Sequence, residues 1–246
     1  LARAERVHIL VMDEKAEERA RHMLEQTHVD FGNVDFFRCP TDRSWTRDYC
    51  PIFVRDKQGC ITITNWRFNG WAKYPNWQTD DQVPSAIARR LRIREVQPRL
   101  GRTRIVLEGG SIDVNGNGLL LTTEECLLSD VQQRNPGFTR EDYETVFRDY
   151  LGIERTIWLR NGIAGDDTHG HIDDIARFVG PQTVVIASET DRQDSNYAPL
   201  AENYRLVKQT DLKVVRLPMP GPVWFARQRL PASYANFYVA NGTVLV

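Results

Sequence analysis

The segment "VLEGGSIDVNGNGLLLT", residues 106–122, decides the fold. An apolar run ends at the charged residue Glu108, two glycines follow, and two β-rich runs then flank an Asn-Gly pair. Asn-Gly suits the positive φ angles of the tight turn that joins two antiparallel strands. The segment therefore predicts a β-hairpin with a carboxylate at its mouth.

The same arrangement recurs along the chain at a nearly constant spacing. The polar residues that enter the four predicted hairpins lie 60, 63 and 65 residues apart, and they are Asp48, Glu108, His171 and Asn236. The other three hairpins are predicted over 50–66, 175–188 and 235–246. Helices are predicted over 14–26, 80–93, 123–133, 139–151 and 196–209, and further strands over 6–13, 34–40, 103–110, 155–160 and 213–217.

Each period thus holds a hairpin, one or two helices and a returning strand. This is a mixed α/β supersecondary unit, and repeated units of this kind are arranged around a common feature. In a ring, the four hairpin mouths would converge on one pocket. The alternative is that alternating α and β elements produce a rough period by chance.

Composition restricts the class of protein. The 246 residues have a net charge of -1, 41% hydrophobic residues and a mean hydropathy of -0.47, which is typical of a soluble folded chain. No basic excess attracts nucleic acid or an anionic membrane. The longest apolar runs, such as Ile9 to Met12, fall far short of the roughly 20 residues that cross a bilayer. We expect neither a nucleic-acid nor a membrane partner.

The four cysteines, Cys39, Cys50, Cys60 and Cys126, show no CxxC spacing. They are too few for a disulfide scaffold. We interpret them as free thiols in a reducing compartment, which predicts a cytoplasmic protein.

The segment "GDDTHGHIDDIARF", residues 165–178, is the densest cluster of reactive side chains. If it is extended, His169, His171 and Asp173 lie on one side, and Asp174 lies on the other. Histidine beside carboxylates is typical of proton transfer near neutral pH. The same atoms could bind zinc or manganese. A third interpretation, a solvated acidic loop, is disfavoured by the apolar continuation.

Two other hairpin mouths carry carboxylates. Taken alone, Asp48 in "SWTRDYCP" forms a turn with its neighbour Arg47, and Trp45 packs in the core. Glu108 is a sharper candidate, because an unpaired charge after an apolar strand is costly to bury. Gly109 and Gly110 let backbone or a ligand approach closely. Glu108 is therefore either a site residue or half of a structural salt bridge.

Taken together, these motifs resemble the agmatine deiminase family, including its peptidylarginine-deiminase-like members. The resemblance runs in order through the whole chain, and its motifs span 45–48, 65–77, 107–111, 119–129, 165–174 and 230–246. It implies an α/β pentein propeller, a ring of five pseudo-symmetric ββαβ modules, which agrees with the observed period. It also implies that residues 1–246 form a single deiminase domain.

The resemblance assigns roles to the residues that match. Asp48 and Asp173 would grip the guanidinium of a small cationic substrate, and two carboxylates can satisfy that planar fork of donors. His171 would be the general acid and base, and Glu108 would pair with it or orient it. Trp45 would line the pocket along the alkyl stem of the substrate. No cofactor and no metal ion are implied.

The implied reaction is hydrolysis of agmatine to N-carbamoylputrescine and ammonia, a step of putrescine and polyamine biosynthesis. It proceeds through a covalent cysteine intermediate. The family's cysteine lies near the C-terminus in a segment resembling GGGxxHC, which is not found in this sequence. None of the four cysteines matches that context, and we expect Cys126 to be a buried structural thiol.

The family's first strand, with its Trp-Pro-His segment, is also missing from this sequence. We therefore expect an incomplete ring that is truncated at both ends and a chain without turnover. Open ring edges are compatible with a homo-oligomer. Two alternatives stay open, a deiminase of arginine or peptidyl-arginine and a noncatalytic module that binds guanidines or metal ions.

Overall fold

The computed structural model describes residues 1–3 and 5–246, and it is built from one repeated unit. In each unit an antiparallel hairpin is followed by helix, and a third strand then pairs in parallel with the second strand of the hairpin. The first unit comprises β3 (Ile52–Arg55), β4 (Ile61–Thr64), α3 (Val83–Leu91) and β5 (Arg94–Val96). The predicted hairpin at 50–66 and its helix are thereby confirmed.

The second and third units have the same topology. The second comprises β8 (Asp113–Val114), β9 (Leu119–Thr123), α4 (Glu124–Leu128), α5 (Arg140–Leu151) and β10 (Arg155–Leu159). The third comprises β11 (Ala176–Gly180), β12 (Thr183–Ser188), α6 (Tyr197–Lys208) and β13 (Lys213–Pro218). Three apolar clusters form the core, and they contain Ile63, Leu120 and Ile186 respectively. The cluster of Ile186 also includes Leu121 and Leu159 of the second unit, so it joins two units.

The two ends of the described chain show parts of the same unit. β1 (Val7–Val11), α1 (Glu14–Glu25) and β2 (Val34–Arg38) repeat its last three elements, with β1 and β2 parallel. β16 (Tyr238–Ala240) and β17 (Thr243–Leu245) repeat its hairpin. The repeat predicted from the spacing of the hairpin mouths is therefore confirmed.

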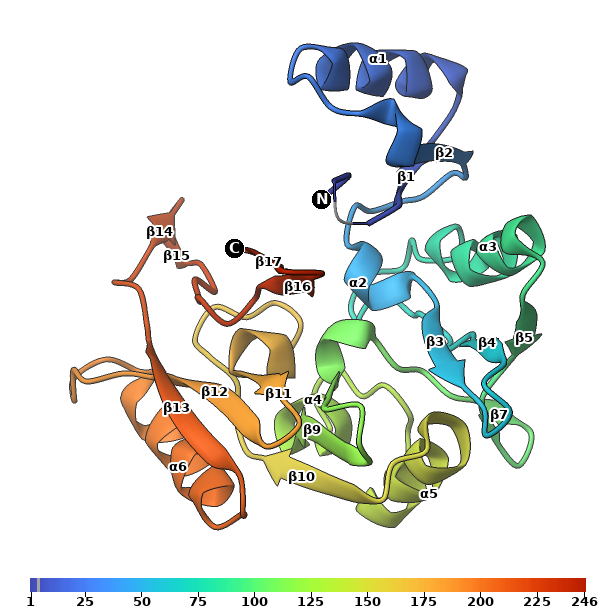
Figure 1. The fold of residues 1–246 in the computed structure, drawn as a ribbon. Coiled ribbons are helices and arrows are strands. Elements are labelled where there is room, and N and C mark those ends of the chain that lie inside the picture. Colours follow the sequence, from blue (N-terminus) through green and yellow to red (C-terminus); the bar gives the residue numbers. More distant parts are fainter. Residues whose placement is uncertain (4) are drawn as a thin grey trace.

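The units lie around a common centre (Figure 1). The short helix α2 (Thr46–Tyr49) lies toward the middle, while α3, α5 and α6 lie at the periphery. Two 3-10 turns, η3 (Gly109–Ser111) and η4 (Ile172–Asp174), contact each other, and α2 contacts η3. These short elements bring segments more than 120 residues apart in the sequence into one place. Among the described residues, no helix combines the length and apolar character needed to cross a membrane.

Two predicted elements are shorter than expected. The strand predicted over 103–110 is reduced to β7 (Thr103–Arg104), paired with β6 (Arg99–Leu100), and Val106 forms only an isolated bridge with Arg67. The helix predicted over 123–133 ends at Leu128, because Ser129 leaves helical geometry and its hydroxyl accepts from the Val131 N–H. Ser competes with helical backbone bonds in this way.

Local signals account well for α5. Thr139 accepts from the Asp142 N–H and Asp142 bonds back to Thr139, which forms a capping box. Gly152 ends the helix in the left-handed region at φ 68°. The helix predicted over 80–93 is divided into the 3-10 turn η2 (Asp80–Gln82) and α3. The elements that were not predicted are all short, namely α2, β5, β6, η3, η4, η1 (Phe31–Asn33), β14 (Trp224–Phe225) and β15 (Gln228–Arg229).

Candidate active site

The hairpin mouths meet at a cavity of about 610 Å³. Asp48 in α2, His171 before η4 and Asn236 before β16 all line it. Glu108 does not line the cavity but lies behind His171, at the start of η3. The structure thus brings together all four residues that the spacing singled out.

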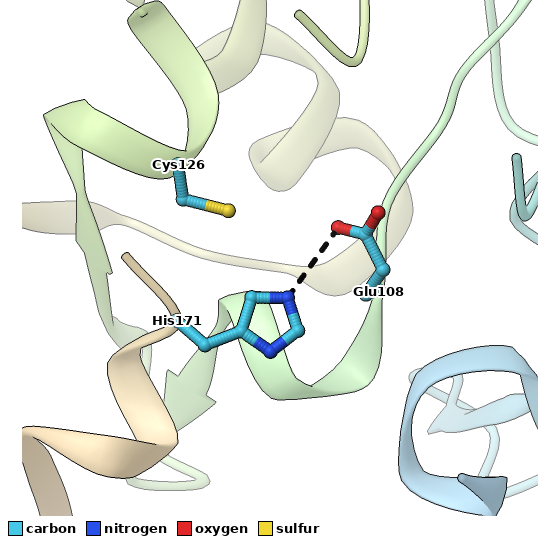
Figure 2. A group of neighbouring side chains, drawn as sticks. All are labelled: Glu108, Cys126 and His171. Carbon is cyan, nitrogen blue, oxygen red and sulfur yellow. Dashed lines mark ion pairs between the residues drawn. The ribbon is translucent and has the colours of Figure 1, made fainter. Parts of the chain in front are cut away.

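His171 is buried, with 3% of its surface exposed, and carboxylates surround it. Its Nδ1 lies 3.9 Å from Asp48 Oδ1 and 3.8 Å from Asp173 Oδ1, and its Nε2 lies 3.9 Å from Glu108 Oε2 (Figure 2). Burial disfavours the charged imidazole, but the negative charges of these carboxylates outweigh it and raise the pKa of His171 to about 9. Near neutral pH this histidine therefore carries a proton that it can donate.

Glu108 is fully buried and forms a salt bridge with Arg134, whose Nε lies 3.0 Å from Glu108 Oε1. The other nitrogens of Arg134 donate to the carbonyl oxygens of Gln132 and Thr168. Burial opposes ionisation of Glu108, but Arg134 and His171 lower its pKa to about 2. Glu108 is therefore half of a buried salt bridge, as one of its two interpretations predicted, and its other oxygen faces His171.

Asp48 is held by two donors. The Gly110 N–H donates to its Oδ1 at 3.0 Å, and the indole N–H of Trp71 donates to its Oδ2 at 3.2 Å. Burial, together with the charges of Asp173 and Glu108, raises the pKa of Asp48 to about 6, although His171 opposes the shift. Asp48 is therefore a carboxyl group that can titrate close to neutral pH.

The interpretation of Asp48 as the partner of its neighbour Arg47 is wrong. Arg47 instead donates from Nη1 to Asp173 Oδ2 at 3.0 Å and from Nη2 to the Phe237 carbonyl at 2.9 Å. The interpretation of Trp45 as a core residue is also wrong, because 64% of its surface is exposed and it lines the cavity.

Gly109 and Gly110 allow the close approach that the sequence suggested. A Cβ at Gly109 would overlap the carbonyl oxygen of Arg47. A Cβ at Gly110 would lie 2.5 Å from His171 Nδ1 and 2.6 Å from Asp48 Oδ1. Both positions therefore exclude any side chain.

The segment 165–174 is turned, and its prediction as an extended segment is wrong. His169 and Gly170 are left-handed, at φ 64° and 88°, and η4 follows, so the side chains do not alternate. His169 consequently points away from His171, with its Nε2 3.1 Å from Ser129 Oγ. Asp166 holds the turn by accepting from the N–H groups of Gly170 and His171, at 2.7 and 3.0 Å.

Asp173 and Asp174 both lie beside the cavity, although alternation had placed Asp174 on the opposite side. Asp174 is buried and accepts from Asn236 Nδ2 at 3.0 Å. Burial and the neighbouring charge of Asp173 raise the pKa of Asp174 to about 7. Asp167 lies at the rim, where it pairs with Lys73 and accepts from Tyr74 at 2.6 Å.

Three of these buried groups have the residue types of a metal site. Ligand atoms of Glu108, Cys126 and His171 lie within 4.8 Å of one another (Figure 2). Arg134 already neutralises Glu108, however, and burial raises the pKa of the Cys126 thiol well above its usual range. The chemistry of this donor set therefore favours an ion-pair network over a bound cation.

Among the residues that the structure describes, all four cysteines are free, as expected, and none lines the cavity. Cys126 is buried in α4, which confirms its prediction as a buried thiol. Burial also raises the pKa of Cys50 to about 12. Neither thiol forms a thiolate readily near neutral pH.

Two residues of this environment were missed from the sequence, Arg134 and Trp71. Arg134 stands in "DVQQRNPGF", which has no apolar periodicity and gives no sign of a buried cation. Trp71 belongs to "NWRFNGWAKYPNW", which was noticed only as part of the family resemblance. No local signal identifies the partner of either side chain.

Comparison with known proteins gives a consistent result. The family model of the Porphyromonas-type peptidyl-arginine deiminases matches residues 1–246. The agmatine deiminase of Pseudomonas aeruginosa is 35% identical over 249 residues, which cover 89% of this chain and 66% of that protein. The agmatine deiminase of Pseudomonas fluorescens is 34% identical over the same shares.

Solved structures of agmatine deiminases are similar to this chain over nearly its whole length. An agmatine deiminase of C. jejuni with substrate bound has a TM-score of 0.87 at 31% identity, covering 99% of this chain and 69% of that chain. The agmatine deiminase of Enterococcus faecalis has a TM-score of 0.85 at 28% identity, covering 99% and 71%. The predicted fold class, an α/β pentein propeller of ββαβ units, is confirmed.

Proposed function

Because the chain belongs to the Porphyromonas-type peptidyl-arginine deiminase family, which includes agmatine deiminases, we propose that it acts on agmatine. The reaction is hydrolysis of the guanidine C–N bond, with N-carbamoylputrescine and ammonia as products. The observation that carries the proposal is the buried His171 within 4 Å of three carboxylates, beside a cavity that Asp48 and Asp173 line.

Asp48 and Asp173 hold the guanidinium. Asp173 Oδ1 is buried and has no hydrogen-bond partner among the described residues, so it can accept from an entering N–H group. A planar cation with several donors satisfies two carboxylates at once. Its positive charge also offsets the burial and the carboxylate repulsion that raise the pKa of Asp48. Trp45 lies beside the alkyl stem.

His171 moves the protons. The family resemblance implies that a cysteine thiolate adds to the guanidinium carbon. No cysteine lines the cavity among the residues that the structure describes. His171 gives its proton to the departing nitrogen, which leaves as ammonia. The neutral imidazole then takes a proton from water as water displaces the thiolate and forms the ureido product. Glu108, anchored by Arg134, keeps the imidazole in place.

The charges around the cavity favour agmatine over arginine. Five aspartates line it, namely Asp48, Asp166, Asp167, Asp173 and Asp174. The two lining arginines are already paired, Arg43 with Asp80 at 3.1 Å and Arg47 with Asp173. The part of the chain that the structure describes therefore offers no unpaired lining cation to the carboxylate of arginine. Agmatine ends in an ammonium group instead, which suits the acidic lining.

Calorimetric titration of the chain with agmatine and with L-arginine tests this proposal. We expect agmatine to bind at least about tenfold more tightly, equivalent to about 1.4 kcal/mol. Asp173→Asn should weaken agmatine binding, while Arg155→Gln, whose partner Asp211 lies outside the cavity, should not. Equal or tighter binding of arginine would contradict the choice of substrate.

The noncatalytic alternative has one observation in its favour, the group of Glu108, Cys126 and His171. Titration with zinc and with manganese distinguishes it from the proposed enzyme. Tight zinc binding that is lost in Cys126→Ser, together with no binding of agmatine, would favour the metal-binding module. Ammonia release from agmatine should be followed in parallel, with His171→Ala as the control.

A further inference from the structure

The loop between β4 and η2 has an unusual backbone at three consecutive positions. Gly70, Trp71 and Ala72 are all left-handed, with φ angles of 66°, 58° and 53°. A bulky residue such as tryptophan rarely adopts this conformation, because its Cβ approaches the following carbonyl group. Strain of this kind persists only where the surrounding structure enforces it, and it is often found at functional sites.

Specific contacts enforce the turn. Asn69 Oδ1 accepts from the Ala72 N–H at 2.8 Å, and Gln132 Nε2 donates to the Trp71 carbonyl at 3.1 Å. The Tyr74 N–H closes the turn on the Gly70 carbonyl at 3.0 Å. A Cβ at Gly70 would lie 2.6 Å from the Tyr74 carbonyl oxygen, so only glycine fits there. Three hydrogen bonds and the lack of space for a side chain at Gly70 therefore specify the left-handed conformation.

The side chain of Trp71 faces the site. It is buried, with 4% exposed, it lines the cavity, and its ring packs edge-on against Phe68 at 5.2 Å. Its indole N–H, its only polar group, donates to Asp48 Oδ2 at 3.2 Å. The Gly110 N–H occupies Asp48 Oδ1 at 3.0 Å. Donors on both oxygens fix the plane of a carboxylate whose charged neighbours include His171, Asp173 and Glu108.

We propose that Trp71 is a positioning residue of the guanidine site, and that the left-handed turn at 70–72 serves to place its indole N–H on Asp48. The indole N–H uses one lone pair of Oδ2, and the Gly110 N–H uses one lone pair of Oδ1. Each oxygen therefore keeps a second lone pair that can accept from a guanidinium. This inference rests on the proposed function for its choice of ligand. It assigns a role to the motif at 65–77, which that function left unexplained.

The first experiment compares two tryptophan variants by calorimetric titration with agmatine. Trp71→Phe keeps the packed ring and removes the N–H group. Trp158→Phe is the matched control, because its indole N–H also donates to a carboxylate, that of Glu144 at 2.9 Å, and neither residue lines the cavity. Loss of a hydrogen bond to a charged acceptor should weaken agmatine binding about tenfold in Trp71→Phe only. Unchanged binding in Trp71→Phe would overturn the inference.

A second measurement needs neither agmatine nor a folded Trp71→Phe variant. The indole N–H resonance of Trp71 should shift with pH as Asp48 titrates, with a midpoint near 6. The charged groups that act on Asp48 include His171, Asp173 and Glu108, and Asp174 lies beside Asp173. Titration of His171 and of Asp174 adds further steps to the profile. Asp48→Asn should therefore remove the step near pH 6 and leave the others. The Trp158 resonance should lack this step.

Together, the two experiments distinguish a wrong substrate from a missing contact between Trp71 and Asp48. If the wild-type chain does not bind agmatine but the Trp71 resonance follows Asp48, the proposed substrate is wrong and the positioning contact stands. If agmatine binds but the Trp71 resonance does not respond to Asp48→Asn, the contact is absent and the inference is wrong.

Discussion

At the scale of single residues, the site is defined by how many charges it buries and how each is compensated. His171, Glu108 and Asp173 are all nearly inaccessible to solvent, and each has one buried polar atom without a hydrogen-bond partner among the described residues. Such groups are costly unless a ligand or a neighbouring charge satisfies them. Their concentration at one cavity is the physical reason to expect a cationic ligand there.

The raised pKa of His171 predicts how stability depends on pH. Because the folded pKa is about 9 and the ordinary value is 6.5, this group stabilises the fold fully below pH 6.5 and loses that contribution as pH rises through 9. The free energy of unfolding should fall by on the order of 3 kcal/mol over this window. Denaturant unfolding at several pH values measures the change.

His171→Gln should remove most of this pH dependence, whereas His169→Gln, outside the cavity, should retain it. A wild-type stability that stays constant from pH 6.5 to 9 would show that the carboxylates do not hold a proton on His171.

Gly110 offers a steric prediction. Gly110→Ala would place a methyl group within 2.6 Å of both His171 and Asp48, and overpacking of this kind costs about 1–3 kcal/mol. We expect lower stability in urea and loss of agmatine binding. Gly221→Ala is the matched control, because no atom lies within 4 Å of its Cβ position and its φ is not positive. Agmatine affinity that survives Gly110→Ala would mean that the two side chains can move apart freely.

At the scale of elements, short turns carry the site while longer helices and strands support it. α2, η3 and η4 each span three or four residues. Side-chain carboxylates accept from backbone N–H groups in or beside two of these turns. Asp166 is one example, since its carboxylate accepts from the N–H groups of Thr168, Gly170 and His171. Without these bonds the turn before η4 has no local means of holding His171.

Two substitutions separate the role of this turn from ordinary capping. Asp166→Ala removes the acceptor of three N–H groups, and Thr139→Ala removes the N-cap of α5. Each should lower the free energy of unfolding, Thr139→Ala by about 1 kcal/mol and Asp166→Ala by about 2 kcal/mol. Only Asp166→Ala should also weaken agmatine binding. Thermal unfolding and calorimetry would show the difference, and weaker binding in both variants would contradict it.

At the scale of the whole molecule, the repeated units converge on one cavity. Asp48, His171 and Asn236 come from different units, and their positions follow from the common topology of the hairpins. A ligand held there contacts several units at once, so its binding energy stabilises the assembly and not one loop.

Hydrogen exchange tests this convergence. Bound agmatine should slow amide exchange in four separate segments, 46–49, 108–111, 166–174 and 233–237, because each contributes to the cavity or to its supporting shell. Peripheral α5 and α6 should change little. Protection confined to a single segment would indicate a local binding site that does not require the ring.

By itself, the sequence determined the repeat, the hairpins, most helices and the four polar residues at the hairpin mouths that the fold brings together. These depend on apolar periodicity, turn residues such as Asn-Gly, and caps such as Thr139, which act over a few neighbouring positions. Where a side chain overrode the local pattern, as Ser129 does at the end of α4, the predicted helix was too long.

Only the tertiary structure decided which charges meet. It pairs Arg47 with Asp173 instead of Asp48, places Arg134 on Glu108, and turns His169 away from the cavity. It also places Trp71 on Asp48 through a strained turn. The paired residues are separated by 23 to 126 positions in the sequence, so no short-range backbone preference links them. The left-handed backbone at His169 is a local feature by comparison. Their pairing follows from the burial of charges, which must be compensated by whatever the packed units bring within reach.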